Sequence, residues 1–318
     1  MQANTMIFNA LDKSKPILVD EFIYDRCLET LILLGFKVIG VPMNKNGIDI
    51  NELEKLIIKY RPAALWRNIR YNNPTGKYIT MDNVYSTGEL CIRYNVIHHL
   101  DDAYENCGVG LESKRDEGPV DLSHKSLRKT ILVRMTTKEF SPHEKISWIV
   151  CGRDCDISER IIRFAKASRL NGHYRLQAAY YISMINNDYQ SHIAWVNVEF
   201  YRPRSLALNK GLNEFFKGFQ FEKIKDASFF TTLWLKKIDI LKGKKIIDIC
   251  AQNGIILTPG IPFCAPINID EQPELVTVKG YPVGISIMSK HSTSILEKMN
   301  GYPVRLSPNA CLNINDYI

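Results

Sequence analysis

The sequence predicts an α/β protein: a mostly parallel sheet covered by helices, followed by a smaller α+β domain at the C-terminal end. From Pro16 to about Val150, short β-branched runs alternate with segments of helical periodicity, which is the pattern of βαβ units. From about Leu206 onward the pattern is a mixture of helices and strands. We therefore expect a large domain over residues 1–205 and a small domain over residues 206–318. No linker rich in Pro, Gly or Ser separates them, so close packing is expected.

Short apolar runs mark the expected strands. Each run is followed by a polar segment or by one that contains Gly or Pro, which ends the strand. In the large domain the expected strands are Ile17–Val19, Val38–Val41, Ala63–Trp66, Val96–Leu100, Ile131–Met135 and Ile146–Cys151. In the small domain, strands are expected near Phe229–Leu235 and Ile255–Leu257.

Helical periodicity between these strands predicts the covering layers. One helix is expected over Tyr24–Leu34, with Gly35 as its end signal. Another is expected after Asn51, because this residue and Glu54 three positions later resemble a capping box ahead of apolar residues at helical spacing. A long helical stretch is expected between residues 154 and 187.

The composition favours a soluble globular protein and excludes a disordered or fibrous chain, with 45% hydrophobic and 24% charged residues. The basic excess is 41 − 34 = 7 residues, but it is spread along the chain and does not favour nucleic-acid binding. No apolar stretch approaches the roughly 18–20 residues that cross a bilayer. Asp12, Lys13 and Lys15 interrupt the region where a signal peptide needs an apolar core. We expect a cytoplasmic protein with no membrane or nucleic-acid partner.

Neither the cysteines nor the paired histidines predict a metal site. The eight cysteines are scattered, and none forms the close pairs with matching partners that bind zinc. Cys151 and Cys155 are the closest pair and are expected to be buried or half-buried thiols. His98 and His99 are neighbours in an expected strand, so they point to opposite faces and are expected to be packed side chains.

Three short segments follow expected strands, at the edge where ligands gather in open α/β sheets. They are Asn73-Pro74-Thr75-Gly76, Asp101-Asp102-Ala103-Tyr104 and Thr136-Thr137-Lys138. Taken singly, they can be an ordinary turn, a helix cap and a solvated charge. Taken in order, with Lys145-Ile146-Ser147-Trp148 beyond, they resemble the active-site series of class I/II aminotransferases, fold type I enzymes that use pyridoxal phosphate. The spacings also fit that family: 101 − 73 = 28 residues and 138 − 101 = 37 residues.

The resemblance extends to other segments, from about residue 11 onward. Val19-Asp20-Glu21-Phe22-Ile23-Tyr24 is similar to the family's V-E-x-P-x-Y, with Phe22 in place of Pro. Thr258-Pro259-Gly260 with Phe263 is similar to the PG-x-x-F turn, and Val304-Arg305-Leu306-Ser307 to the R-L-S segment. The style of the motifs resembles the aminoadipate, kynurenine and aromatic branch.

The resemblance implies a role for each matched residue. Lys138 forms a Schiff base with the cofactor aldehyde and shuttles a proton. Asp101 keeps the pyridine nitrogen protonated, and Asn73 and Tyr104 hydrogen-bond the ring hydroxyl oxygen. Arg305 binds the substrate carboxylate with both arms of its guanidinium.

The phosphate site is where this chain departs from the family. The matched segments begin after the family's glycine-containing helix start and its ring-stacking aromatic residue, so the phosphate is left to Thr137 and Lys145. Lys145 stands where the family prefers Arg, and Met135 where it has Ser. Because charge-assisted hydrogen bonds contribute about 1.5–3 kcal/mol each, we expect weakened cofactor binding.

The leading hypothesis is a pyridoxal 5'-phosphate-dependent aminotransferase, expected as a homodimer, that transfers an amino group between an amino acid and a 2-oxo acid. The alternative is a catalytically impaired, truncated paralogue or a regulatory or structural protein that keeps the fold. A third possibility is that the chain is one part of a longer product. The visible absorbance of the purified protein separates the first two hypotheses.

Overall fold

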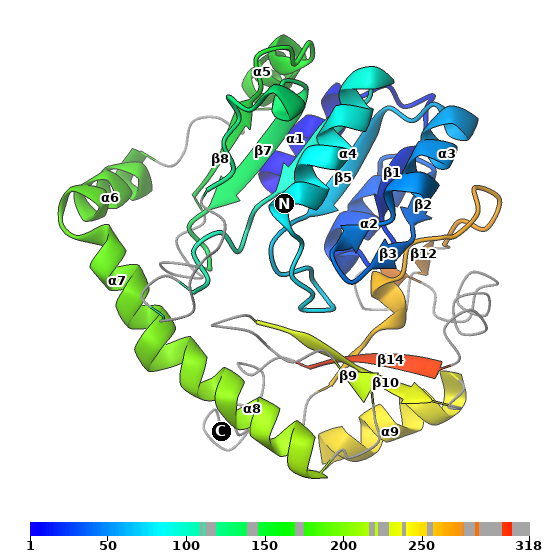
Figure 1. Ribbon diagram of the computed structural model, residues 1–318, viewed down its shortest axis with the longest axis vertical. Helices are drawn as coiled ribbons and strands as arrows, with labels where there is room; N and C mark the ends of the chain where they lie inside the picture. Colours follow the sequence, from blue (N-terminus) through cyan, green and yellow to red (C-terminus); the bar gives the residue numbers. More distant parts are fainter. Residues whose placement is uncertain are drawn as a thin grey trace.

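The large sheet of the computed structural model confirms the predicted architecture. The described residues are 1–108, 111, 119–138, 146–168, 175–215, 220–221, 229–236, 240–252, 257–273, 275–276, 284–285 and 301–306. Six strands form the sheet in the order β2-β1-β5-β6-β7-β8. They are β1 (Ile17–Asp20), β2 (Val38–Val41), β5 (Ala64–Asn68), β6 (Ile97–Asp101), β7 (Thr130–Met135) and β8 (Ser147–Cys151). Neighbouring strands are parallel except for β7 and β8, so the sheet is mostly parallel (Figure 1).

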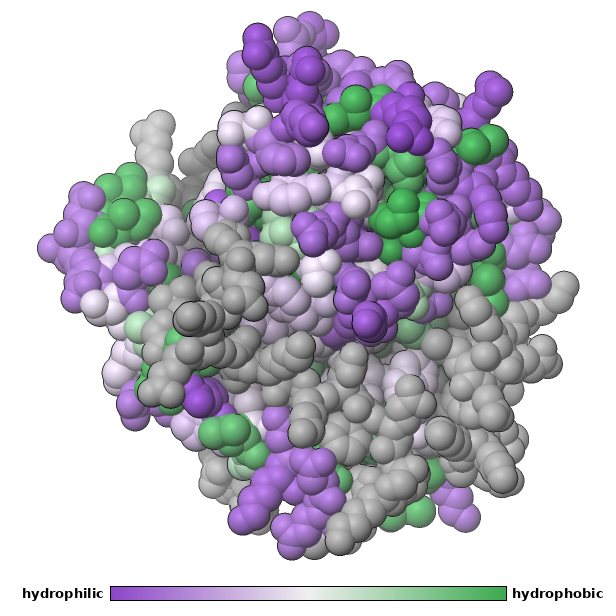
Figure 2. Space-filling model, in the orientation of Figure 1, coloured by the Kyte–Doolittle hydropathy of each residue, from purple (hydrophilic) through white to green (hydrophobic). Residues whose placement is uncertain are grey.

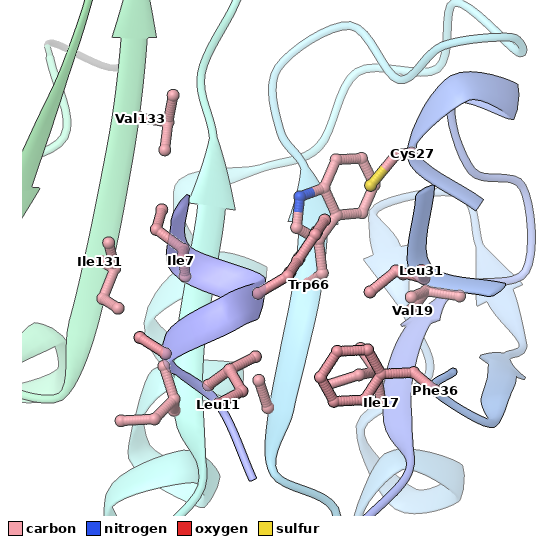
Figure 3. Close-up of a cluster of buried hydrophobic side chains, with 14 of the residues drawn as sticks. Ile7, Leu11, Ile17, Val19, Cys27, Leu31, Phe36, Trp66, Ile131 and Val133 are labelled. Carbon is pink, nitrogen blue, oxygen red and sulfur yellow. The ribbon is translucent and has the colours of Figure 1, made fainter. Parts of the chain in front are cut away.

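Helices cover both faces of this sheet, so that β1, β2, β5 and β6 are buried along their whole length. Along β1, Ile17 and Val19 belong to one apolar cluster and Leu18 to another, as the alternation of side chains along a strand requires. The first cluster includes residues of α1 (Gln2–Ala10), α2 (Asp25–Leu33) and α5 (Ser158–Ala167), and Figure 3 shows part of it around Trp66. The second cluster includes residues of α3 (Ile50–Tyr60) and α4 (Met81–Arg93). Each fully buried aliphatic side chain contributes about 1.5–3 kcal/mol of transfer free energy.

The start of α3 differs from the expected capping box. The N-cap is Asp49, whose side chain accepts hydrogen bonds from the backbone N–H groups of Asn51 (3.0 Å) and Glu52 (3.1 Å). Asn51 therefore lies inside the first turn. Asp49 is as good a capping residue as Asn51, and its backbone is extended as a cap requires, so local geometry decides between them.

A series of helices connects the two sheets along an arc at one side of the molecule (Figure 1). It consists of α6 (Arg175–Asn186), α7 (Tyr189–Trp195), the π-helical segment η2 (Val196–Tyr201) and α8 (Arg202–Phe215). The expected boundary near residue 205 falls within α8. The division into 1–205 and 206–318 therefore stays a prediction.

The smaller sheet is antiparallel and has the order β11-β14-β10-β9. Its strands are β9 (Gln220–Phe221), β10 (Thr231–Lys236), β11 (Thr258–Pro259) and β14 (Gly301–Leu306), and α9 (Ile240–Gln252) leads from β10 toward β11. The remaining short elements are β3 (Met43–Asn44), β4 (Gly47–Ile48), β12 (Leu275–Val276), β13 (Gly284–Ile285) and the 3₁₀ turns η1 (Lys125–Leu127) and η3 (Ile261–Phe263).

Hydrophilic side chains predominate on the part of the surface built around the large sheet, on the face that Figure 2 shows. A hydrophobic group is visible over α6, where Ile182 is 58% exposed and Ile185 is 49% exposed. Among the described residues, no helix is both long enough and apolar enough to span a membrane.

Candidate active site

A cavity of about 860 Å³ lies at the carboxyl ends of β5, β6 and β7 and extends to the smaller sheet. This is the edge at which the sequence predicted a site. Five of the predicted residues line it: Asn73, Asp101, Tyr104, Thr137 and Lys138. The structure therefore brings them to one place, while the role of each remains a prediction.

Two predicted residues are described less fully. Lys145 lies outside the described residues. Arg305 lies in β14, where its backbone is paired with Thr232 of β10 on one side and with Thr258 of β11 on the other. Thr258 lines the cavity, so Arg305 occupies a register position next to the cavity wall.

Asp101 is the last residue of β6, and its carboxylate is almost completely buried. Its Oδ2 accepts a hydrogen bond from Nδ2 of Asn4 at 2.8 Å. Its Oδ1 makes no hydrogen bond within the described residues, and the backbone N–H of Ala103 lies close enough to help stabilise the charge. Burial raises the pKa of Asp101, and the hydrogen bond from Asn4 opposes that shift. One carboxylate oxygen is therefore held while the other is available to a ligand.

The turn that carries Asn73 is fixed from both sides. The backbone N–H of Asn73 donates to Oδ1 of Asn68 at 2.9 Å, at the end of β5. Gly76 has φ +71°, and a Cβ there would lie 2.0 Å from the carbonyl oxygen of Phe230. The hydroxyl of Thr232 donates to the carbonyl of Pro74 at 3.1 Å. The segment is therefore more than an ordinary turn, because it joins the large sheet to the smaller one, and only glycine fits its closest approach.

Lys138 lies three residues beyond the end of β7, in the segment that leaves the sheet. Its Nζ lies 5.7 Å from the centre of the Phe229 ring, within range of a cation–π interaction. Its backbone carbonyl accepts a hydrogen bond from the Tyr201 hydroxyl at 3.3 Å. Burial raises the pKa of Tyr201 to about 12, so the phenol keeps its proton and remains a donor at neutral pH.

Buried ion pairs tie together the strand ends that carry the site. Asp102 follows Asp101 and lies 3.4 Å from Nε of Arg70, just beyond β5, and 3.9 Å from Nε of Arg134 in β7. Arg134 also pairs with Glu105 at 2.8 Å. These contacts connect the ends of three neighbouring strands, and removing the buried Asp102 would break two of the ion pairs at once.

The first residues of α1 provide a feature that the sequence reasoning missed. Met1, Gln2 and Ala3 line the cavity at the N-terminus of α1, where backbone N–H groups and the helix dipole favour an anion. Tyr24 also lines it and provides an aromatic side chain. The described residues thus place a helix N-terminus and an aromatic side chain at the cavity, two features to which the sequence reasoning gave no role.

A sequence signal for both features was present. Ala3, Ile7 and Phe8 are apolar at helical spacing ahead of the first strand, and Tyr24 ends one of the segments that carried the family resemblance. Other cavity residues gave no signal of their own. They include Tyr24's neighbours Asp25 and Arg26, as well as Trp66, Asn68 and Phe230. Met135, Ile146 and Ser147 also line the cavity, and they were compared with the family without being given a role.

The chain belongs to the class I and II aminotransferase family, whose family model matches residues 2–269. The match begins at residue 2 rather than at about residue 11, so it includes α1. It ends before Arg305, whose assignment therefore rests on the R-L-S segment alone.

Several known proteins are similar to this chain. The HTH-type transcriptional regulator NorG of Staphylococcus aureus (strain N315) is 26% identical over 232 residues, which are 71% of this chain and 49% of that protein. The mitochondrial kynurenine/alpha-aminoadipate aminotransferase of Bos taurus is 25% identical over 275 residues, 81% of this chain and 61% of that protein. The chain thus spans about half the length of NorG and about three fifths of the bovine enzyme.

Solved structures show that the fold is that of fold type I aminotransferases. The kynurenine aminotransferase of Pyrococcus horikoshii superposes with a TM-score of 0.74 at 20% identity, covering 99% of this chain and 69% of that one. LysN, an alpha-aminoadipate aminotransferase from Thermus thermophilus, superposes with a TM-score of 0.72 at 17% identity, covering 96% and 69%. The predicted fold class is confirmed.

Proposed function

We propose that this chain is a pyridoxal 5'-phosphate-dependent aminotransferase that transfers an amino group between an amino acid and a 2-oxo acid. The observation that carries the proposal is the placement of Lys138 and Asp101 in one cavity of about 860 Å³, at the carboxyl ends of neighbouring strands. Membership of the class I and II aminotransferase family supports it. So does LysN, whose solved structure is a complex with N-(5'-phosphopyridoxyl)-L-leucine.

The residues of the cavity suit this cofactor. Oδ1 of Asp101 is buried and without a hydrogen-bond partner among the described residues, so it can accept a hydrogen bond from a protonated ring nitrogen. Tyr24 supplies an aromatic ring to pack against the cofactor ring. Thr137 and the N-terminus of α1 supply donors for a phosphate, and Lys145 is the cation that the sequence assigns to it.

The proposed mechanism assigns a role to each of these residues and to Arg305. When bound, pyridoxal phosphate supplies an electron sink for the charge that develops on the substrate α-carbon. Asp101 would hold the ring nitrogen protonated, and Asn73 and Tyr104 would hydrogen-bond the ring hydroxyl oxygen. The amine of Lys138 would hold the cofactor covalently and, once the amine of the substrate has displaced it, would move the proton to and from the α-carbon. Arg305 binds the substrate carboxylate.

We further propose a cytoplasmic homodimer. The helices that run from α6 to α8 expose large apolar side chains, which favours burial against a second subunit. These are Tyr180, Ile182, Ile185, Trp195, Phe200 and Leu206. Light scattering at micromolar concentration should give twice the mass of the chain, and a mass of one chain would contradict the proposal.

The non-catalytic alternative receives no specific support. NorG is a regulator by name, but its similarity is 26% identity and reaches 49% of its length. An intact set of cavity residues from Asn73 to Lys138 favours the enzyme.

The experiment that tests the proposed function combines absorbance with chemical labelling. Adding pyridoxal 5'-phosphate to the purified protein should produce a visible band, and borohydride reduction followed by peptide mapping should label Lys138. Lys77→Ala is a matched control, because the Lys77 amine donates to the carbonyl of Asn44 outside the cavity. Labelling of another lysine, or no visible band, would contradict the proposal.

A further inference from the structure

A buried polar chain leads from the cavity into the core on the α1 side of the large sheet. Asp101 lies at its cavity end, followed by Asn4 of α1 and His99 of β6. Asn4 is 1% exposed and His99 is 0% exposed. Both lie on the α1 side of the sheet, where the buried cluster around Trp66 is apolar. Buried polar side chains of this kind cost free energy unless they are paired, so their arrangement requires an explanation.

The chemistry of the groups fixes the direction of each hydrogen bond. An ionised carboxylate only accepts, so the amide nitrogen of Asn4 must face Oδ2 of Asp101, at 2.8 Å. The amide oxygen of Asn4 then faces Nε2 of His99, at 3.0 Å. An amide oxygen also only accepts, so Nε2 of His99 must carry the proton.

His99 is held neutral in this arrangement. Burial lowers its pKa to about 3, so the ring carries one proton at neutral pH, and Asn4 places that proton on Nε2. Its Nδ1 has no hydrogen-bond partner within the described residues. His99 therefore orients the amide of Asn4 without adding a charge near Asp101.

We propose that Asn4 is a positioning residue that holds Asp101 through Oδ2, favours its ionised form over the protonated one, and leaves Oδ1 free to bind the ring nitrogen of the cofactor. The proposal rests on the proposed function for the cofactor, but the contact between Asn4 and Asp101 does not. Asn4 acts through Asp101, and each end of its amide makes one of the two hydrogen bonds. His99 is the support that fixes the orientation of Asn4.

Two substitutions separate this role from simple packing. Asn4→Leu has a similar size and removes both hydrogen bonds. Asn4→Asp keeps an acceptor for His99 but replaces the donor to Asp101 with a second carboxyl group, which repels it once both are ionised. Asn9→Leu and Asn9→Asp are the matched controls, because Asn9 lies in the same helix and bonds only the carbonyl of Thr5 among the contacts described for it.

The first measurement uses the protein without cofactor. A donor to a carboxylate stabilises the ionised form more than the protonated form. The folding equilibrium constant of Asn4→Leu, relative to the unsubstituted chain, should therefore be about 10-fold lower at pH 8 than at pH 4. Asn4→Asp should show the same trend, because at pH 4 a protonated carboxyl can still donate. When Asp101→Asn is already present, the effect of Asn4→Leu on the folding equilibrium constant should be the same at pH 4 and pH 8.

The second measurement is the affinity for pyridoxal 5'-phosphate by absorbance titration at pH 8. Loss of one charge-assisted hydrogen bond should weaken binding about 10- to 100-fold in both Asn4 variants, and less than threefold in the Asn9 controls. His99→Leu should weaken it less than Asn4→Leu does, because Asn4 can still donate to Asp101.

The outcomes separate the two proposals. A stability loss that is equal at pH 4 and pH 8 in the Asn4 variants would overturn the role of Asn4, whatever the cofactor does. Unchanged cofactor affinity in those variants would also overturn it. If the unsubstituted chain binds no pyridoxal phosphate, the proposed function fails, and the dependence of stability on pH still decides whether Asn4 favours the ionised form of Asp101. If Asn4→Leu does not fold, the same tests apply to Asn4→Asp, which keeps the size of the side chain.

Discussion

The ends of β6 and β7 lie side by side at the cavity, and they present their functional residues in opposite ways. Asp101 is the last residue of its strand, is 5% exposed and accepts a hydrogen bond from Asn4. Lys138 lies three residues beyond its strand, with its amine over the face of an aromatic ring. One group is fixed by the sheet, and the other stands on a segment that leaves it.

This difference fits the roles proposed for Asp101 and Lys138. A carboxylate that holds a charge in place works best when its position is set in advance and needs no reorganisation. A lysine that forms a covalent bond and then moves a proton has to reach more than one atom. The long side chain of a lysine on a connecting segment can reach several atoms, while the end of a strand sets the position of a carboxylate in advance.

The largest expected effect comes from Lys138, at the end of β7. Lys138→Ala removes the amine, so amino-group transfer should fall by at least about 10³-fold, because both covalent attachment and proton transfer are lost. The measurement is the rate of transfer from an amino acid to a 2-oxo acid at saturating pyridoxal phosphate. Lys77→Ala should keep its rate, and a Lys138→Ala variant within tenfold of the unsubstituted chain would mean that another residue moves the proton.

Substitution of Asp101, at the end of β6, should give the next largest loss of rate, while it should increase the stability of the chain without cofactor. Asp101→Asn keeps the size but removes the charge, so transfer should fall about 10²- to 10³-fold, as expected when a buried charge pair loses one partner.

The effect on stability follows from the direction of the pKa shift. Burial is the main cause that raises the pKa of Asp101 above its usual value of 3.8, so the folded chain binds the proton more tightly than the unfolded chain does. The free energy of unfolding therefore falls as pH rises from about 4 through the raised pKa. Without cofactor, Asp101→Asn should be more stable than the unsubstituted chain at pH 8, and this advantage should shrink toward pH 4. Chemical denaturation at both pH values measures it, and a greater advantage at pH 4 would show the opposite shift.

A smaller effect is expected at Thr137, on the same segment as Lys138. Thr137→Val removes a hydroxyl that lines the cavity while keeping the shape of the side chain. If this hydroxyl binds the phosphate, the affinity for pyridoxal 5'-phosphate should weaken about 10-fold. Isothermal titration measures it, with Thr30→Val as a control in α2, where the hydroxyl donates to the carbonyl of Arg26. Equal affinities in the two variants would remove Thr137 from the phosphate site.

The smallest effect concerns the aromatic ring below the amine. Phe229→Leu keeps an apolar side chain but removes the ring face, which contributes about 0.5–1 kcal/mol to a nearby cation at such sites. The rate at which borohydride traps pyridoxal phosphate on Lys138 should change about two- to fivefold. Phe36→Leu is the control for lost packing, since Phe36 is buried in the core beside α2. A change of the same size in both variants would show that packing alone is responsible.

Much of the site was predictable because it follows from strand ends. Asn73, Asp101 and Lys138 come after apolar runs that end abruptly, and parallel strands place such ends at one edge. Asn4 could not be predicted as a partner of Asp101, since 97 residues separate them and the contact depends on how α1 packs on the sheet. The capping residue of α3 was also misplaced, because two neighbouring candidates differ only in backbone conformation.

The close approach of Gly76 to Phe230 also bears on movement between the two sheets. At this point backbone touches backbone, with a hydrogen bond from Thr232 to Pro74 beside it. If the smaller sheet moves while these contacts are preserved, it must rotate about an axis that passes close to them. The cavity wall farthest from the turn would then travel most, while Asn73 next to the pivot would stay almost still. Such a hinge would let the cavity open to admit a substrate without disturbing the residue expected to hold the cofactor ring.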